Sequence, residues 1–208
     1  EAKTLGTISI GKRIISNNTP VFVIAEAASN HMCDLELAKQ MIDKASEAGV
    51  DAIKFQTYKA EKLVTKDATA FWGNETISQI EYYKKLDLFG KPEFEELFKY
   101  AVDKGIIGFS SPFDAESSDM LNELGMPLFK IASCDIPNIQ HIRQIANFKK
   151  PIILSTGAST VEEIDRAIYT IFKEDNFQLI LLACTLNYPT PYHQANFRRI
   201  QTLKERYP

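Results

Sequence analysis

The stretch that decides the fold runs from Asp51 to Tyr58 and reads DAIKFQTY. β-Branched and aromatic residues dominate it, which is typical of a short β-strand. Alternation along a strand places Ile53 and Phe55 on one face and Lys54 and Gln56 on the other. An ammonium group on the inner face of a strand is costly unless it meets an anion. Two interpretations are therefore open: an edge strand with a solvated Lys54, or a covered strand whose Lys54 binds an anion.

The same pattern, a short apolar strand with a polar end and then an amphipathic helix, recurs along the chain. The predicted strands are Val21 to Ala27, Ala52 to Tyr58, Ile107 to Ser111, Leu128 to Ser133, Ile152 to Thr156 and Leu179 to Thr185. The predicted helices are Leu35 to Ala48, Pro92 to Lys104, Ala115 to Leu124, Ile139 to Phe148, Val161 to Phe172 and Phe197 to Arg206. Strands that alternate with helices predict a parallel sheet covered by helices.

Six such βα units suit either a doubly wound open sheet or most of a (β/α)8 TIM barrel. No GxGxxG motif follows the first strand, which counts against a dinucleotide-binding fold. We therefore predict an α/β fold, a TIM barrel of which this chain holds the first six βα units. Two apolar patches split by Gly11 predict a β-hairpin cap over residues 1–20, and residues 21–208 are predicted to form the partial catalytic barrel.

Composition excludes several classes of function. The chain has 208 residues, a net charge of −3 and no Lys/Arg run, so no nucleic-acid partner is expected. It contains no apolar run long enough to cross a bilayer, so no membrane association is expected. Its three cysteines are an odd number without zinc-like spacing. They indicate reduced thiols and a cytoplasmic location.

A long insertion separates the second strand from its helix. This insertion, residues 59–91, is far longer than an ordinary βα loop. It carries the aromatic residues Phe71, Trp72, Tyr82 and Tyr83. In a barrel this loop lies on the face where active sites form. The aromatic side chains either cover a substrate or pack the loop itself.

Polar residues gather at the C-terminal ends of the predicted strands, which converge on one rim in a parallel barrel. They are Glu26, Asn30, His31, Lys54, Gln56, Ser110, Ser111, Lys130, Ser133, Asp135, Ser155, Thr156, Thr185, Asn187 and Tyr188. Lysines together with hydroxyl groups suit a phosphate or a carboxylate. A carboxylate such as Glu26 can act as a base or orient water. The site is therefore predicted to bind anionic, phosphorylated, hydroxyl-rich reactants.

Structural interpretations of the same residues stay open. Lys54 and Lys130 could each pair with a core carboxylate, and Glu26 could accept hydrogen bonds from backbone N–H groups. Ser155 and the threonine after it could be turn-capping hydroxyls. His141 and His193 are expected to be solvated. His31 either positions a partner or is a polar residue whose hydrogen bonds are satisfied within the protein.

Five long segments match one known family in the order in which they occur. They are IAEAASNHMCDLELA (24–38), AGVDAIKFQTYKAEKL (48–63), FSSPFDAESSDMLNELGMPLFKIAS (109–133), KPIILSTGAS (150–159) and CTLNYPTPYHQANF (184–197). The chain thus resembles the sialic acid synthase (N-acetylneuraminate synthase) family, including its pseudaminic and legionaminic acid synthase relatives. The resemblance covers about residues 21–208.

The resemblance implies an enzyme that condenses phosphoenolpyruvate with an N-acetylated amino sugar, either N-acetylmannosamine or a diacetamido-dideoxy hexose. The products would be a nine-carbon 2-keto sugar acid and phosphate. In the family, carbon 3 of phosphoenolpyruvate attacks the sugar aldehyde, water adds to carbon 2, and phosphate leaves. A divalent metal, Mn2+ or Mg2+, polarises that aldehyde.

The resemblance also implies roles for individual residues. The implied catalytic residues are Glu26, Lys54, Lys130 and Asp135. The implied substrate-binding residues are Asn30, Gln56, Ser111, Ser133, Ser155, Asn187 and Tyr188. Asp135 stands where the family usually has Glu, which shortens the carboxylate arm by one methylene. Cys134 replaces a common Gly, and Met32–Cys33 replaces the usual Asn-Gly.

The family's two metal-binding histidines lie beyond residue 208, so no metal ligand is expected in this chain. The antifreeze-like domain, which reaches the partner subunit's site, also lies beyond residue 208. We therefore expect the chain to be part of a longer, homodimeric protein. Two alternatives are a Schiff-base aldolase with Lys130 or Lys54 as nucleophile, and a non-catalytic barrel fragment that binds sugar or phosphate.

Overall fold

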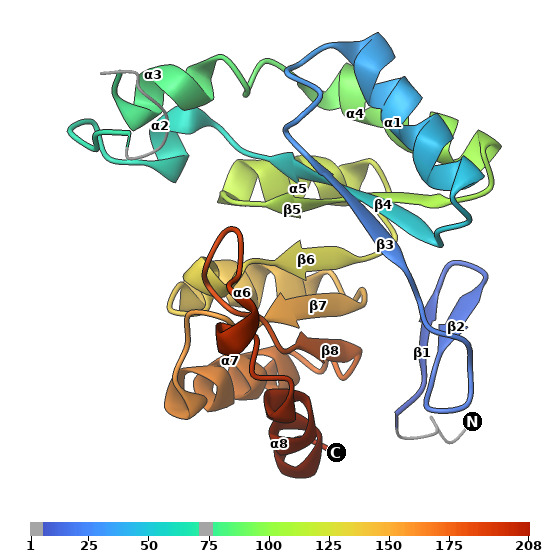
Figure 1. Cartoon of the computed structure of the whole chain (residues 1–208), viewed down its shortest axis with the longest axis vertical. Coiled ribbons are helices and arrows are strands. Elements are labelled where there is room, and N and C mark those ends of the chain that lie inside the picture. The colour runs from blue at the N-terminus through green and yellow to red at the C-terminus, as the bar shows by residue number, and fades with distance from the viewer. Residues whose placement is uncertain (1–5, 71–76) are drawn as a thin grey trace. The chain divides into compact units, whose positions relative to one another are not determined.

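The structure is a computed structural model that describes residues 6–70 and 77–208. The chain divides into two compact units, residues 21–126 and residues 1–20 with 127–208. Both are built from βα units with parallel strands (Figure 1). The predicted α/β class, with an N-terminal hairpin, is confirmed.

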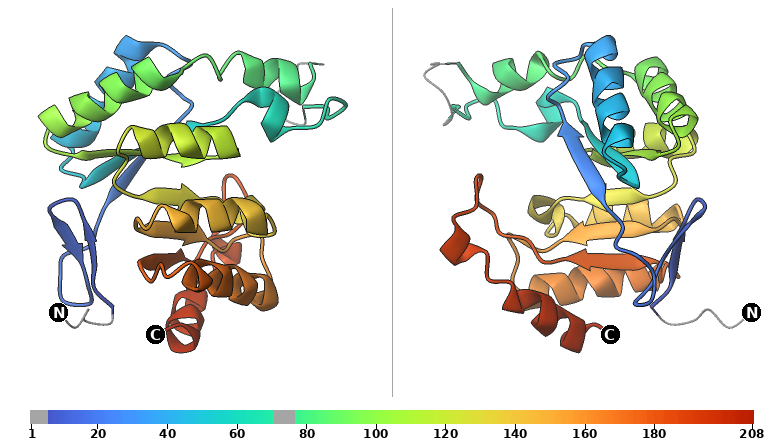
Figure 2. Two further views of the ribbon diagram at one scale, coloured as in Figure 1. Left: turned by 180° about the vertical axis from the view of Figure 1, so that it is seen from behind. Right: turned by 45° about the vertical axis from the view of Figure 1, so that its right-hand side comes forward.

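The unit of residues 21–126 contains a parallel sheet with the order β3 (Ile24–Ala28), β4 (Ala52–Thr57) and β5 (Ile107–Pro112). Its helices are α1 (Leu35–Glu47), α2 (Ala60–Leu63), α3 (Gln79–Lys84), α4 (Lys91–Asp103) and α5 (Ala115–Glu123). Helices α1 and α4 lie side by side over the sheet (Figures 1 and 2). Their apolar faces meet β4 in one core, in which Ile42, Phe55 and Leu97 are fully buried.

The unit of residues 1–20 and 127–208 contains two sheets. Strands β1 (Ile8–Ile10) and β2 (Arg13–Ile15) form the predicted antiparallel hairpin. A parallel sheet has the order β6 (Phe129–Ile131), β7 (Ile152–Ser155) and β8 (Leu179–Leu182). The helical segments are η1 (Ser133–Asp135), α6 (Ile139–Asn147), α7 (Val161–Lys173), η2 (Tyr192–Gln194) and α8 (Arg198–Arg206). Helices α6 and α7 cover one face of the parallel sheet, as the front view in Figure 1 and the rear view in Figure 2 show.

Capping residues define the helix starts. The side chains of Asp34, Asp114, Asn138 and Thr160 each accept a hydrogen bond from a backbone N–H in the first turn of the following helix. These four groups satisfy donors that a helix N-terminus leaves unpaired. The six predicted helices, α1, α4, α5, α6, α7 and α8, begin and end within one residue of the predicted bounds.

The structure corrects several predictions about local structure. The fourth strand spans Phe129–Ile131 and not Leu128 to Ser133, and the sixth strand ends at Leu182 and not at Thr185. The first strand begins at Ile24 and not at Val21, because the Val23 N–H donates to the Asp51 carboxylate at 2.7 Å before the sheet begins. The insertion contains α2 and α3, which the sequence patterns do not reveal. His141 is 5% exposed and not solvated, because it lies on the buried side of α6. Phe71 and Trp72 lie outside the described residues.

Candidate functional site

Lys54 lies in the central strand β4, so its interpretation as a solvated residue on an edge strand is wrong. Its side chain is buried, and its Nζ lies 2.7 Å and 2.9 Å from the two carboxylate oxygens of Glu26. Residues 26 and 54 are direct partners in the β3–β4 register, which places their side chains side by side. The ammonium therefore meets an anion, as a buried lysine must.

The Lys54–Glu26 pair is open on its acidic side. The Glu26 side chain is 48% exposed, and its Oε1 also accepts a hydrogen bond from the Ala28 N–H at 3.1 Å. Lys54 Nζ donates to Ser111 Oγ at 3.2 Å, and Ser111 is buried at the end of β5. Since Ser111 accepts here, its own proton stays available for a ligand oxygen. The arrangement combines a cation, a hydroxyl donor and a solvent-facing carboxylate.

Gln56 follows Lys54 on the same face of β4. Its Oε1 lies 3.5 Å from Ser29 Oγ, which lies 3.2 Å from the phenol oxygen of Tyr58. Burial raises the pKa of Tyr58 to about 12, so the phenol keeps its proton. Asn30 is exposed in the turn after β3.

His31 is buried in the same turn and stacks on Phe89, with ring centroids 4.8 Å apart. Its Nδ1 accepts a hydrogen bond from the Cys33 N–H at 3.1 Å, which leaves the proton on Nε2. In the part of the chain that the structure describes, Nε2 has no hydrogen-bond partner. Burial lowers the pKa of His31, so the imidazole is neutral at pH 7.

Lys130 and Asp135 lie in the other unit. Lys130 is buried, and its Nζ donates to the Ile131 carbonyl at 2.8 Å. Burial raises the pKa of Asp135 to about 6, while the charge of Lys130 and a hydrogen bond from the Cys134 side chain act against that rise. Asp135 Oδ2 is buried and accepts no hydrogen bond from the described residues. A carboxyl with this pKa can both give and take a proton near neutral pH.

Two hydroxyls at the end of β7 differ in their partners. Thr156 Oγ1 donates to the Leu182 carbonyl at 2.9 Å, so this hydroxyl caps the backbone. Ser155 Oγ accepts a hydrogen bond from the Cys184 thiol at 3.5 Å, and Ser155 is 8% exposed. Ser133, the first residue of η1 after β6, is buried as well. Ser155 therefore keeps a proton that it can donate to a ligand, whereas Thr156 does not.

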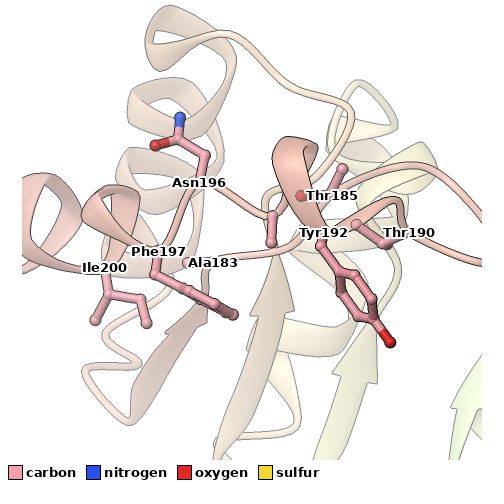
Figure 3. A pocket seen from close by; sticks show the side chains of 8 residues that line it. Ala183, Thr185, Thr190, Tyr192, Asn196, Phe197 and Ile200 are labelled. Carbon is pink, nitrogen blue, oxygen red and sulfur yellow. The ribbon is translucent and has the colours of Figure 1, made fainter.

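The segment after β8 lines a hollow of about 310 Å3. In Figure 3, Phe197 and Ile200 lie on one side of this hollow, and Thr190 and Tyr192 lie on the other. Asn187 donates to Gln194 Oε1 at 2.9 Å, and the Tyr188 side chain is 91% exposed. The Asn187 backbone N–H donates to the Thr185 carbonyl at 3.0 Å, so these two predicted residues share a turn after β8.

The structure thus brings the predicted site residues together in two sets. Glu26, Lys54 and Ser111 are in contact in the unit of residues 21–126, and Lys130 lies near Asp135 in the other unit. That all the predicted residues line one rim stays a prediction. Sequence patterns missed Ser29, Tyr58 and Cys184, although all three lie within the segments that carry the family resemblance.

The described residues do not fit a metal ion. Over residues 6–70 and 77–208, no group of three or more His, Cys, Asp and Glu side chains could hold one. In the same ranges, no helix has both the length and the apolar character that a membrane span requires.

Parallel βα units with charged and hydroxyl side chains at the C-terminal strand ends define an α/β protein of the TIM-barrel type. The profile of the NeuB family matches residues 41–208, and the chain belongs to this family.

Named relatives agree with that assignment. The chain is 40% identical over 190 residues to the N,N'-diacetyllegionaminic acid synthase of Campylobacter jejuni, a match that covers 88% of this chain and 57% of the relative. It is 38% identical over 198 residues to the pseudaminic acid synthase of the same species, covering 90% of this chain and 56% of the relative. The chain spans about half the length of these curated relatives.

A solved structure shows the same fold. The crystal structure of the N-acetylneuraminic acid synthetase of Leptospira borgpetersenii, in complex with citrate, matches with a TM-score of 0.87 and 40% identity. The match covers 97% of this chain and 67% of that chain. The predicted family and fold class are confirmed.

Proposed function

We propose that the protein containing this chain condenses phosphoenolpyruvate with an N-acetylated amino sugar to form a nine-carbon 2-keto sugar acid and phosphate. Membership of the NeuB family and similarity to legionaminic and pseudaminic acid synthases support this reaction class. The observation that carries the proposal is the buried Lys54 ammonium in the central strand β4, held by Glu26 and Ser111. A phosphorylated enol acid is the kind of reactant that such a group binds.

In this proposal, two sets of side chains bind phosphoenolpyruvate. Lys54 and Ser111 donate to its anionic oxygens, the lysine as a charge and the serine through its unused proton. Lys130, Ser133 and Ser155 supply the corresponding donors of the other unit. Their burial supports the role, because a buried donor interacts with an anion more strongly than a solvated one does.

Glu26 and Asp135 are the proposed acid–base groups. Glu26 lies beside Lys54 with half of its side chain exposed, which suits a carboxylate that acts on a bound reactant or water. The raised pKa of Asp135 suits a group that takes a proton from the water attacking carbon 2 and later releases it. We assign binding of the sugar to Asn30, Gln56, Asn187 and Tyr188.

The divalent metal implied by the family resemblance concerns the whole protein. Because the described residues of this chain do not fit a metal ion, we derive no step through it. A homodimer and a cytoplasmic location also stay predictions.

A phosphate-release assay on the complete natural protein tests the proposal. N-Acetylmannosamine and the diacetamido-dideoxy hexoses are offered separately, each with phosphoenolpyruvate and Mn2+. We expect one of these sugars to trigger phosphate release that EDTA abolishes. Phosphate release with none of them contradicts the proposal, and a borohydride-trapped pyruvate adduct on Lys54 or Lys130 identifies an aldolase instead.

A further inference from the structure

Three polar side chains at the ends of β3 and β4 form a short hydrogen-bonded row that ends at Gln56. The Tyr58 phenol oxygen lies 3.2 Å from Ser29 Oγ, and Ser29 Oγ lies 3.5 Å from Gln56 Oε1. The three residues come from two segments of one unit, and their side chains meet because β3 and β4 are paired in parallel.

The direction of donation along this row follows from counting protons. Gln56 Oε1 can only accept a hydrogen bond, so the Ser29 hydroxyl donates its single proton to it. The Tyr58 hydroxyl is protonated, since burial raises its pKa to about 12, and it therefore donates to Ser29 Oγ. The Gln56 side-chain carbonyl is thereby directed at Ser29, and its NH2 group faces away from the row.

The aromatic surroundings hold Tyr58 in place. Its ring packs edge-to-face on Tyr83 of α3, with centroids 5.5 Å apart, and on Phe113 with centroids 6.1 Å apart. Tyr58 is 5% exposed, so its phenol has little room to reorient. The long insertion thus contributes Tyr83 to the support of the row.

We propose that Ser29 and Tyr58 are positioning residues that orient the Gln56 carboxamide so that it presents its NH2 group as a hydrogen-bond donor to an acceptor oxygen of the sugar substrate. This inference rests on the proposed function of the site. In this proposal, Gln56 selects a sugar whose carbonyl or hydroxyl oxygen accepts a hydrogen bond from its NH2 group. A sugar that has only a hydrogen-bond donor at this position binds poorly.

Steady-state kinetics on the complete protein test the proposal, with phosphate release as the readout. Tyr58→Phe keeps the ring and removes the hydroxyl, and Ser29→Ala removes the central link. We expect each to raise KM for the sugar about 3- to 10-fold while kcat and KM for phosphoenolpyruvate change by less than about 2-fold. Tyr100→Phe is the matched control, because it removes a phenol hydrogen bond to Asp43 on the helices of the same unit.

Two further variants separate positioning from a general structural role. Gln56→Glu keeps an acceptor for Ser29 but has no NH2, so we expect it to lose as much sugar affinity as Gln56→Ala. In the double variant Ser29→Ala/Gln56→Ala, we expect no loss beyond that of Gln56→Ala, because Ser29 acts only through Gln56. Retained sugar affinity in Gln56→Glu, additive losses in the double variant, or parallel losses in phosphoenolpyruvate binding would overturn the proposal.

A readout without activity keeps this inference distinct from the proposed function. The side-chain NH2 resonances of Gln56, assigned by their absence in Gln56→Ala, report the order of the carboxamide. We expect an ordered amide in the natural protein and a mobile one in Ser29→Ala and Tyr58→Phe. An amide equally mobile in all three refutes the row, whereas an ordered row in a protein that no sugar activates refutes only the proposed reaction.

Discussion

Replacing Lys54 by Met tests the anion site directly. The substitution keeps the long unbranched stem in its buried position and removes only the ammonium, whose Nζ lies 2.7 Å from Glu26 and 3.2 Å from Ser111. Because Glu26 is 48% exposed, water can solvate the carboxylate that loses its partner. We therefore expect the free energy of unfolding to change by no more than about 1 kcal/mol.

The effect on phosphoenolpyruvate is expected to be larger. A hydrogen bond between an ammonium and an anionic ligand contributes about 1.5–3 kcal/mol, which corresponds to a roughly 10- to 100-fold weaker Kd. Isothermal titration calorimetry with phosphoenolpyruvate measures this change, and urea unfolding measures stability in parallel. A small change in stability together with a large change in affinity would assign the ammonium to ligand binding.

The matched control is Lys39→Met. Lys39 also contacts two glutamates, Glu36 at 3.0 Å and Glu96 at 2.6 Å, but it lies on helix α1 and not in the central strand. Its loss is expected to leave the Kd of phosphoenolpyruvate unchanged. A folded Lys54→Met protein that binds phosphoenolpyruvate within about 3-fold of the natural affinity would refute the assignment of the site.

Three other perturbations test separate features. Burial raises the pKa of Asp135 from 3.8 to about 6. The free energy of unfolding is therefore expected to fall by at most roughly 3 kcal/mol as pH rises from about 4 to above 6. Urea unfolding at a series of pH values should show this fall in the natural protein and not in Asp135→Asn. Gly157→Ala would place a Cβ 3.2–3.3 Å from the Cβ and the carbonyl group of Cys184. Thermal unfolding should show that this variant lowers the free energy of unfolding by about 1–3 kcal/mol. The control Gly90→Ala, whose Cβ would meet nothing closer than 3.6 Å, should change it little. Asp114 caps α5 and accepts from Ser117 N at 2.8 Å, so Asp114→Ala should lower stability by about 1–2 kcal/mol in the same measurement, and an unchanged unfolding midpoint would contradict the role of the cap.

Local signals in the sequence determined the elements of this protein. Apolar periodicity with caps such as Asp34 and Thr160 defined the helices, because capping satisfies backbone groups within one turn. The alternation in residues 51–58 and its recurrence defined parallel βα units, and five ordered motifs defined the family. All of these properties depend on residues that are close together in the chain.

Tertiary structure alone decided which polar groups meet. Lys54 pairs with Glu26 and Ser111, which are 28 and 57 residues away, and the row from Tyr58 to Gln56 passes through Ser29. His141 is buried, although its sequence neighbourhood suggested solvent. The register of parallel strands and the helix face that packs on them are chosen by the burial of the whole apolar surface, and no short segment carries that information.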